Sequence, residues 1–184
     1  MPKVLIPLAQ GCEELEAVTL IDILRRAGII VVSAGLDDQV VKASRGVALI
    51  PDTTLDQALQ HRFDMLVLPG GQPGSDNLKA DPRIVALLQE MAQAGKYTCA
   101  ICAAPAVLAA AGLLDGKRAT SYPGSLAAAS NVTLSAAPVV KDGNVITSRG
   151  PGTAMDFALE LVETLVGKTK RDEVEAGLQR PGKY

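Results

Sequence analysis

The sequence predicts an α/β sandwich in which helices cover both faces of a mainly parallel β-sheet. Short apolar segments rich in β-branched residues alternate along the chain with longer segments of helical periodicity. The strand-like segments are apolar on both faces, as expected for strands that lie between two helical layers. No repeat, low-complexity tract or linker interrupts the 184 residues, so we expect a single domain over residues 1–184.

The predicted strands are short aliphatic runs bounded by turn residues. In chain order they span 4–9, 29–34, 64–68 and 97–101. Two further pairs of short segments flank turn sequences and predict hairpins. These pairs are 40–43 with 47–50, around Ser44–Gly46, and 139–140 with 145–147, around Asp142–Asn144.

The predicted helices carry apolar side chains with helical spacing. In chain order they span 15–27, 54–60, 82–94, 103–111, 153–166 and 168–178. Gly28 and Gly95 follow the first and third of them, and Pro82 opens the third, which are typical positions for these residues. The last segment, 179–184, is polar with proline and glycine, and we expect it to be loose.

Composition excludes several classes of function. Lys and Arg number 18 against 20 Asp and Glu, the net charge is −2, and no basic block exists, so we do not expect nucleic-acid binding. No apolar run reaches the roughly 18 residues of a membrane span, and the N-terminus lacks the pattern of a signal peptide. We therefore expect a cytoplasmic protein whose three cysteines, Cys12, Cys99 and Cys102, are reduced thiols.

Cys102 gives the strongest chemical signal because it lies where a predicted strand meets a predicted helix. Such a tight turn projects a nucleophile above the sheet, and small neighbours such as Ala103 leave its approach open. We expect the positive end of the following helix to lower the pKa of the thiol. The alternative is a buried, inert cysteine, and the local pattern alone favours neither.

Other chemistry fits the cysteines less well. Cys99 and Cys102 form a C-x-x-C pattern, but Cys99 lies inside a strand, which favours a packed residue over a redox pair. Zinc is not expected, since no second cysteine pair exists and Cys12 with His61 would be an improvised ligand set. We expect neither a metal nor a cofactor.

Three segments are expected to meet at the carboxyl edge of the sheet, where such folds bind ligands. They are residues 10–14, residues 70–75 and the turn around Cys102. The glycine-rich sequence at 69–74 lacks the spacing of a dinucleotide or P-loop motif. It fits better a tight turn whose backbone N–H forms half of an oxyanion hole.

A histidine partner for Cys102 is not expected. His61, the sequence's one histidine, precedes a strand and belongs at the amino edge of the sheet, roughly 17 Å from the carboxyl edge. The best substitutes are the acids after the first strand. Glu13 and Glu14 are explained by the general preference for acidic residues at the start of a helix. Glu16 is therefore slightly favoured as the acid beside Cys102. A buried Glu16 would have a raised pKa and could donate a hydrogen bond to sulfur or shuttle a proton.

Four motifs in order along the chain resemble the DJ-1 branch of the DJ-1/ThiJ/PfpI superfamily. They are GCEELE at 11–16, LPGG at 68–71, AICAAP at 100–105 and TSRGPGT at 147–153. The resemblance implies a flavodoxin-like sandwich and a homodimer. It also implies that Cys102 is the reactive cysteine, that Glu16 is a protonated carboxyl bonded to it, and that the N–H groups of Gly71 and Ala103 bind an oxyanion or sulfinate oxygens. Further pocket residues by this resemblance are Gly70, Tyr122, Glu13, Arg149 and Pro151.

Three positions depart from patterns found among such proteins. Tyr122 stands near a place where many members have histidine, and it will not act as a base near neutral pH. Ala103 stands where the protease-like branch has histidine, which disfavours a peptidase. Ala43 stands where some members have a second cysteine, so regulation through that residue is not expected.

The resemblance implies cofactor-free conversion of methylglyoxal or glyoxal to hydroxy acids, deglycation of early glycation adducts, or redox-regulated chaperoning. We therefore predict a cysteine enzyme for small α-oxoaldehydes or their adducts, acting through Cys102 and Glu16. The alternative is an oxidative-stress sensor or chaperone in which Cys102 becomes a sulfinate. A flavin or nucleotide carrier rests on fold analogy alone.

Overall fold

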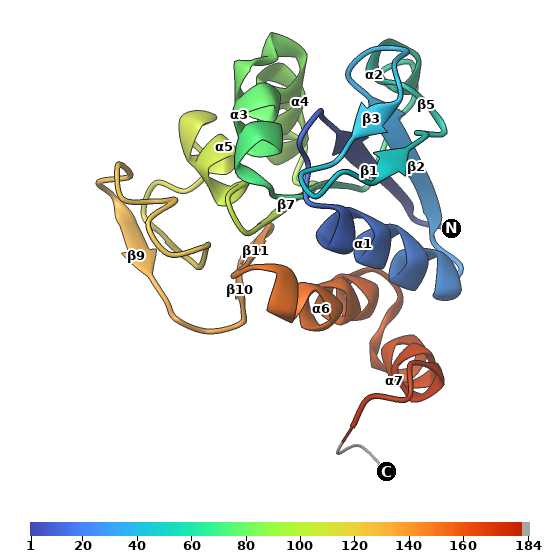
Figure 1. The fold of residues 1–184 in the computed structure, drawn as a ribbon. Coiled ribbons are helices and arrows are strands. Elements are labelled where there is room, and N and C mark those ends of the chain that lie inside the picture. The colour runs from blue at the N-terminus through green and yellow to red at the C-terminus, as the bar shows by residue number, and fades with distance from the viewer. Residues whose placement is uncertain (182–184) are drawn as a thin grey trace.

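A seven-stranded sheet forms the centre of the computed structural model, which describes residues 1–181 (Figure 1). The strand order is β10-β11-β7-β6-β1-β2-β5. Every neighbouring pair is parallel except β10 and β11. The strands are β1 (Lys3–Leu8), β2 (Ile30–Gly35), β5 (Thr53–Thr54), β6 (Met65–Leu68), β7 (Tyr97–Ile101), β10 (Val139–Asp142) and β11 (Val145–Ser148). This arrangement confirms the predicted α/β sandwich, and the central order β2-β1-β6-β7-β11 is flavodoxin-like.

Helices cover both faces of the sheet (Figure 1). One face packs against α1 (Glu14–Arg26) and α6 (Ala154–Val166), and α7 (Lys168–Gly177) lies against α6. The other face packs against a second group of four helices. These are α2 (Leu55–Ala58), α3 (Gln72–Ala80), α4 (Pro82–Gln93) and α5 (Pro105–Ala110).

Alternation along the strands divides the core into these two halves. In β1, Val4, Ile6 and Leu8 face the α1–α6 layer, whereas Leu5 faces the opposite layer. All four side chains are buried, as are those of β6. These strands are apolar on both faces because they lie between two helical layers, as the sequence predicted.

Two small sheets lie outside the central one. β3 (Val41–Lys42) and β4 (Ala48–Leu49) form the antiparallel hairpin expected around Ser44–Gly46. β8 (Lys117–Ala119) and β9 (Val132–Leu134) form a parallel pair that the sequence did not reveal.

Several element boundaries differ from the prediction. The segment 70–75, expected as a turn, already contains the start of α3, and the predicted helix at 54–60 is only α2, preceded by β5. The helix after Cys102 begins at Pro105 rather than at residue 103, so a turn separates the cysteine from α5. None of the helices between residues 1 and 181 has the length and apolar content that a bilayer crossing requires.

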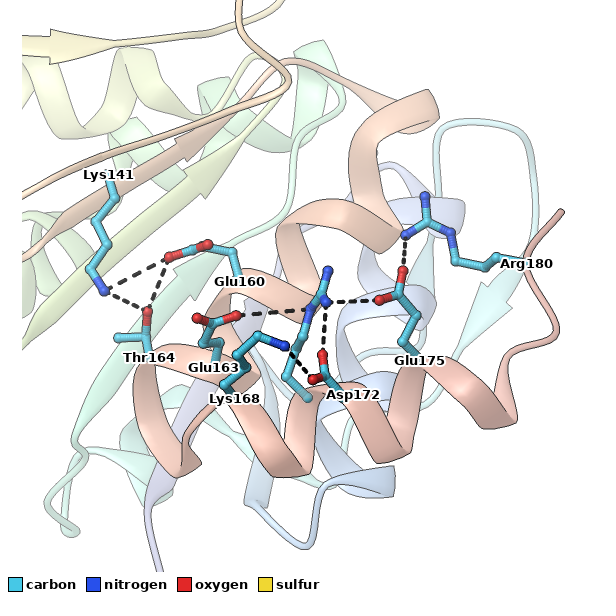
Figure 2. Close-up of polar contacts among 9 residues, drawn as sticks. Lys141, Glu160, Glu163, Thr164, Lys168, Asp172, Glu175 and Arg180 are labelled. Carbon is cyan, nitrogen blue, oxygen red and sulfur yellow. Dashed lines mark hydrogen bonds and ion pairs between the residues drawn. The ribbon is translucent and has the colours of Figure 1, made fainter. Parts of the chain in front are cut away.

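The C-terminal helix is held by an ion-pair network (Figure 2). Glu175 of α7 is almost fully buried and pairs with Arg171 and Arg180. Arg180 also reaches Asp156 in the first turn of α6, with 2.7 Å between Nη2 and Oδ1. Of the segment 179–184 that we expected to be loose, residues 182–184 lie outside the described residues.

Candidate functional site

Three chain segments converge at the carboxyl edge of the sheet, as the sequence predicted. The backbone N–H of Glu13 donates to the carbonyl of Gly70 at 2.9 Å, and that of Gly74 donates to Gly11 at 3.1 Å. Gly70 lies so close to Cys102 that an added Cβ would come within 2.5 Å of the cysteine Cβ. The site therefore forms between the ends of β1, β6 and β7.

Cys102 occupies a strained turn immediately after β7. Its φ of +65° lies in the left-handed region, which costs a non-glycine residue roughly 1–2 kcal/mol. The turn is fixed on both sides, because the Cys102 N–H donates to Ser148 at 3.0 Å and its carbonyl accepts from the Tyr122 N–H at 2.8 Å. The backbone N–H groups of Gly71 and Ala103 lie near enough to the sulfur to lower the pKa of the thiol. The side chain is mostly buried and sits among polar backbone groups at the sheet edge.

Glu16 is fully buried on the first turn of α1. Its Oε2 accepts a 2.8 Å hydrogen bond from the Gly70 N–H. Its Oε1 meets no donor at standard geometry within residues 1–181, but the Cys102 thiol lies within hydrogen-bonding range of the carboxyl and alters its pKa. Two arrangements satisfy both groups: a protonated Oε1 can donate to the Cys102 sulfur, or the Cys102 thiol can donate to a carboxylate oxygen of Glu16.

The pKa values of the two groups are coupled. Burial raises the pKa of the Glu16 carboxyl to about 7, against the opposing hydrogen bonds from Gly70 and Cys102. Burial and the nearby Glu16 charge raise the pKa of the Cys102 thiol to about 12, against the N–H groups of Gly71 and Ala103. The pair therefore loses one proton near pH 7 and the second near pH 12. Our expectation that a helix end lowers the thiol pKa is wrong, because α5 starts three residues later and burial dominates.

The neighbouring acids have separate structural roles. The Glu13 carboxylate caps α1 by accepting from the Glu16 N–H at 2.8 Å. The Glu14 carboxylate ties the β3–β4 turn to α1 through Ser44 and the Arg45 N–H. Among the three acids, Glu16 alone is buried beside Cys102. Its position four residues before the buried Leu20 was a helical-spacing signal that could have singled it out.

The remaining residues named from the sequence take several positions. His61 is exposed before β6, at the amino edge, as expected. Cys12 and Cys99 are fully buried, and burial raises the pKa of both thiols. Tyr122 is half-exposed and lines a pocket together with Ala103.

Arg149 and Pro151 do not line the pocket that contains Ala103. Arg149 borders a separate pocket and donates from Nη1 to the carbonyl of Ala136 at 3.0 Å. Pro151 begins the short 3-10 helix that precedes α6. A role for these two residues stays a prediction.

The glycines at the start of α3 are required by close contacts. A Cβ on Gly70 would lie 2.5 Å from Cys102 Cβ and 2.6 Å from Glu16 Oε2. Gly71 has a φ of +87°, and its Cβ would lie 2.5 Å from the Gly11 carbonyl oxygen. These contacts require glycine at both positions, because a side chain at residue 70 would collide with Cys102 and Glu16 and one at residue 71 with the segment before α1.

We expect Gly70→Ala to destabilise the fold by about 1–3 kcal/mol, as overpacking of a filled site does, and to separate Cys102 from Glu16. Urea unfolding and the rate of Cys102 alkylation check both effects. Gly177→Ala is the matched control without crowding, since neither Gly70 nor Gly177 has a left-handed φ and a Cβ at Gly177 would meet nothing within 4 Å. Equal stability of the Gly70→Ala variant and the wild type would contradict the predicted clash.

Comparisons with known proteins place the sequence and the fold among related chains. A sequence model of the DJ-1/PfpI family matches residues 2–164. The Drosophila melanogaster protein dj-1beta is 48% identical over 177 residues, which cover 95% of each chain. The glutathione-independent glyoxalase DJR-1.2 of Caenorhabditis elegans is 36% identical over 173 residues, 93% of this chain and 91% of that protein. The crystal structure of Drosophila DJ-1beta superposes with a TM-score of 0.92 at 47% identity, covering 96% of this chain and 97% of that one.

Proposed function

The chain belongs to the DJ-1/PfpI family, and from this premise we propose that it is a cofactor-independent enzyme that converts small α-oxoaldehydes to 2-hydroxy acids. The observation that carries the proposal is the pairing of a strained cysteine, faced by two backbone N–H groups, with a buried acid whose pKa is raised to about 7. A relative of this chain is named a glutathione-independent glyoxalase, which agrees with such chemistry.

The Cys102–Glu16 pair supplies a nucleophile and a proton carrier near neutral pH. The pKa of the Cys102 thiol is raised to about 12 while Glu16 is charged, but we propose that the single negative charge of the pair rests on sulfur, because the N–H groups of Gly71 and Ala103 lower that pKa and Glu16 can take up the proton. In this arrangement Glu16 keeps the remaining proton on Oε1, from which it donates to the sulfur. The proton is therefore held between the two groups that the reaction uses.

The proposed reaction rearranges the substrate and adds water. The Cys102 sulfur attacks the aldehyde carbon, and the resulting oxyanion is stabilised by the N–H groups of Gly71 and Ala103. Glu16 first gives its proton to this oxyanion, and the resulting carboxylate moves the proton of the former aldehyde carbon to the adjacent carbonyl carbon. The hydroxyl proton passes from the first oxygen to the second, which leaves a thioester of the 2-hydroxy acid and a Glu16 carboxylate that recovers its proton when water is added. Water cleaves the thioester to release the acid and regenerate the thiolate. The aldehyde carbon is oxidised and its neighbour is reduced, so no external redox partner is needed.

Product analysis tests this function. The purified protein is incubated with methylglyoxal in buffer without glutathione or metal, and lactate is measured by NMR. We expect lactate to form catalytically, over many turnovers per cysteine. Disappearance of methylglyoxal without lactate, or only one equivalent of covalent adduct, would overturn the proposal.

A redox sensor is the second candidate, because the same N–H groups of Gly71 and Ala103 would bind the oxygens of a Cys102 sulfinate. Mild peroxide treatment followed by mass spectrometry distinguishes the two. Selective addition of two oxygen atoms to Cys102, with negligible aldehyde turnover, favours the sensor. Cys12 and Cys99 should stay unmodified because both are fully buried.

We also propose that the protein is a homodimer. On α1, Leu15 and Val18 are exposed by 51% and 48%, and the half-exposed Val47 is near them, because its N–H lies 3.5 Å from the Glu14 carboxylate. A second copy would cover these apolar side chains. Light scattering should give twice the 19.1 kDa chain mass, and Leu15→Glu should shift it toward the monomer. A monomeric wild-type protein at micromolar concentration would contradict the dimer.

A further inference from the structure

A pocket of about 360 Å³ opens beside the Cys102 turn. Ala103 and Tyr122 line it and are both tied to Cys102: Ala103 follows the cysteine in the chain, and the Tyr122 N–H donates to the Cys102 carbonyl. Gln72, directly after Gly71, lines the same pocket. The pocket is thus lined by the residues next to Cys102 and Gly71 in the chain, though not by the thiol itself, and it extends along α3.

One face of α3 forms a wall of this pocket. Gln72, Ser75, Asp76 and Lys79 all line it, and their spacing of i, i+3, i+4 and i+7 places them on one side of the helix. Each of them carries a polar or charged side chain. The pocket therefore offers a row of hydrogen-bonding groups that leads away from Cys102.

The groups of this row hold one another in place. Nε2 of Gln72 donates to both carboxylate oxygens of Asp76 at 3.2 and 3.1 Å, which turns its Oε1 away from Asp76. Nζ of Lys79 lies 3.7 Å from Asp76 Oδ1, so the two charges offset each other. Oγ of Ser75 is buried and has no hydrogen-bond partner in the described part of the chain. A ligand in this pocket meets hydrogen-bond acceptors and donors side by side. The charges of Asp76 and Lys79 offset each other, so the bound part of the ligand needs no charge of its own.

Size and polarity both argue for a ligand longer than methylglyoxal. Pockets of 300–1,000 Å³ typically hold drug-sized molecules, and a three-carbon oxoaldehyde fills a small part of such a volume. A hydroxyl group donates and accepts at once, so neighbouring hydroxyls suit an adjacent carboxylate and ammonium without breaking their pair. An apolar tail would instead leave Asp76 and Lys79 partly desolvated without new partners.

We propose that this pocket binds the hydroxylated tail of longer, sugar-derived α-oxoaldehydes, and that Asp76 and Lys79 make the protein select them over methylglyoxal. The inference rests on the proposed function and leaves its chemistry unchanged. The aldehyde carbon is still oxidised to the carboxylate, the adjacent carbonyl is reduced to the carbinol, and water is the co-reactant. The tail contributes binding only, so its effect is on specificity.

The ratio of kcat/KM for 3-deoxyglucosone, a six-carbon 2-oxoaldehyde with a hydroxylated tail, to kcat/KM for methylglyoxal tests the proposal. We expect this ratio to exceed one in the wild type and to fall about tenfold in Asp76→Ala, as loss of one or two hydrogen bonds to a charged group does. Lys79→Met should lower it in the same direction. Glu173→Ala is the matched control, because Glu173 pairs with Lys170 in another exposed i,i+3 pair, on α7, far from α3. It should leave the ratio unchanged.

The outcomes separate the two proposals. Turnover of methylglyoxal with a ratio below one, or with a ratio that Asp76→Ala leaves unchanged, would overturn the tail site while the proposed function stands. Failure of both substrates to react would overturn the proposed function. Saturation-transfer NMR on Cys102→Ala then still tests binding alone. We expect the tail protons of 3-deoxyglucosone to receive saturation from the protein, and Asp76→Ala to remove this transfer. An absence of transfer to the tail protons in Cys102→Ala would refute the tail site.

Discussion

Replacement of Cys102 by serine is expected to lower the turnover of methylglyoxal by a factor on the order of 10³ or more. A hydroxyl in the same position stays protonated near neutral pH and is a far weaker nucleophile than a thiolate. The backbone of the turn should persist, because the hydrogen bonds from Cys102 to Ser148 and from Tyr122 to Cys102 involve main-chain atoms only. Loss of activity would therefore report on chemistry rather than on folding.

Cys99→Ala is the matched control for this substitution. Cys99 lies three residues earlier in β7, is fully buried, and contacts the core rather than the Gly71 and Ala103 N–H groups. Its truncation should cost stability through a small cavity, by about 1 kcal/mol, and leave turnover within a factor of about two. Lactate production assayed by NMR for both variants decides the question. Activity retained in Cys102→Ser would remove the covalent mechanism.

The central architecture could be predicted because burial on both faces leaves a simple mark in the sequence. β6 is a continuous apolar run, and β1, β2 and β7 are mostly apolar, each with a polar residue such as Lys3, Ser33 or Thr98. The main helices carry a regular apolar face. The elements that escaped prediction have no such mark. β5 is only two residues long, and the strands β8 and β9 are partly exposed, so neither periodicity nor apolar content distinguishes them from loops.

α3 escaped prediction for a different reason. Its sequence begins Gln72-Pro73-Gly74, which is typical of a turn. Pro73 is tolerated because it lies in the first helical turn, where an N–H has no helical partner. Gly74 is needed because a Cβ there would lie 2.6 Å from the Cys12 backbone. The close contact with Cys12 requires glycine at position 74, and that glycine makes the start of α3 resemble a turn in the sequence.

The candidate site could be located from the sequence but not assembled from it. The position of Cys102 follows from the strand–helix junction, and the exclusion of His61 follows from sheet polarity. The choice among Glu13, Glu14 and Glu16 depends on which carboxyl turns inward, and that is decided by the fit of Gly70 between α1 and the Cys102 turn. The raised thiol pKa also depends on burial, which the local sequence does not display.

The location of the shared charge has a measurable consequence in Glu16→Gln. If the charge rests on sulfur, the wild-type alkylation rate of Cys102 should rise with pH through an apparent pKa near 7, since that is where the pair loses its first proton. The amide can still donate to sulfur, but an N–H bond is weaker than the O–H bond of a carboxylic acid to a thiolate. A loss of about 1 kcal/mol in stabilisation of the thiolate raises its apparent pKa by roughly 0.7. Turnover of methylglyoxal should fall about 100-fold or more, because glutamine cannot carry the proton.

A negative charge placed on Glu16 instead of sulfur predicts that Glu16→Gln shifts the pKa of Cys102 in the opposite direction. A charge that rests on the carboxylate keeps the thiol protonated up to a pKa near 12 in the wild type, and removal of that charge in Glu16→Gln would then lower the thiol pKa. Rates of iodoacetamide addition between pH 5 and 10, followed by mass spectrometry of Cys102, distinguish the two directions. Glu14→Gln is the control, because that carboxylate faces the β3–β4 turn and should not move the profile. A downward shift in Glu16→Gln would mean that Glu16 acts as a base toward the thiol, and the proton carrier in the first step would have to be reassigned.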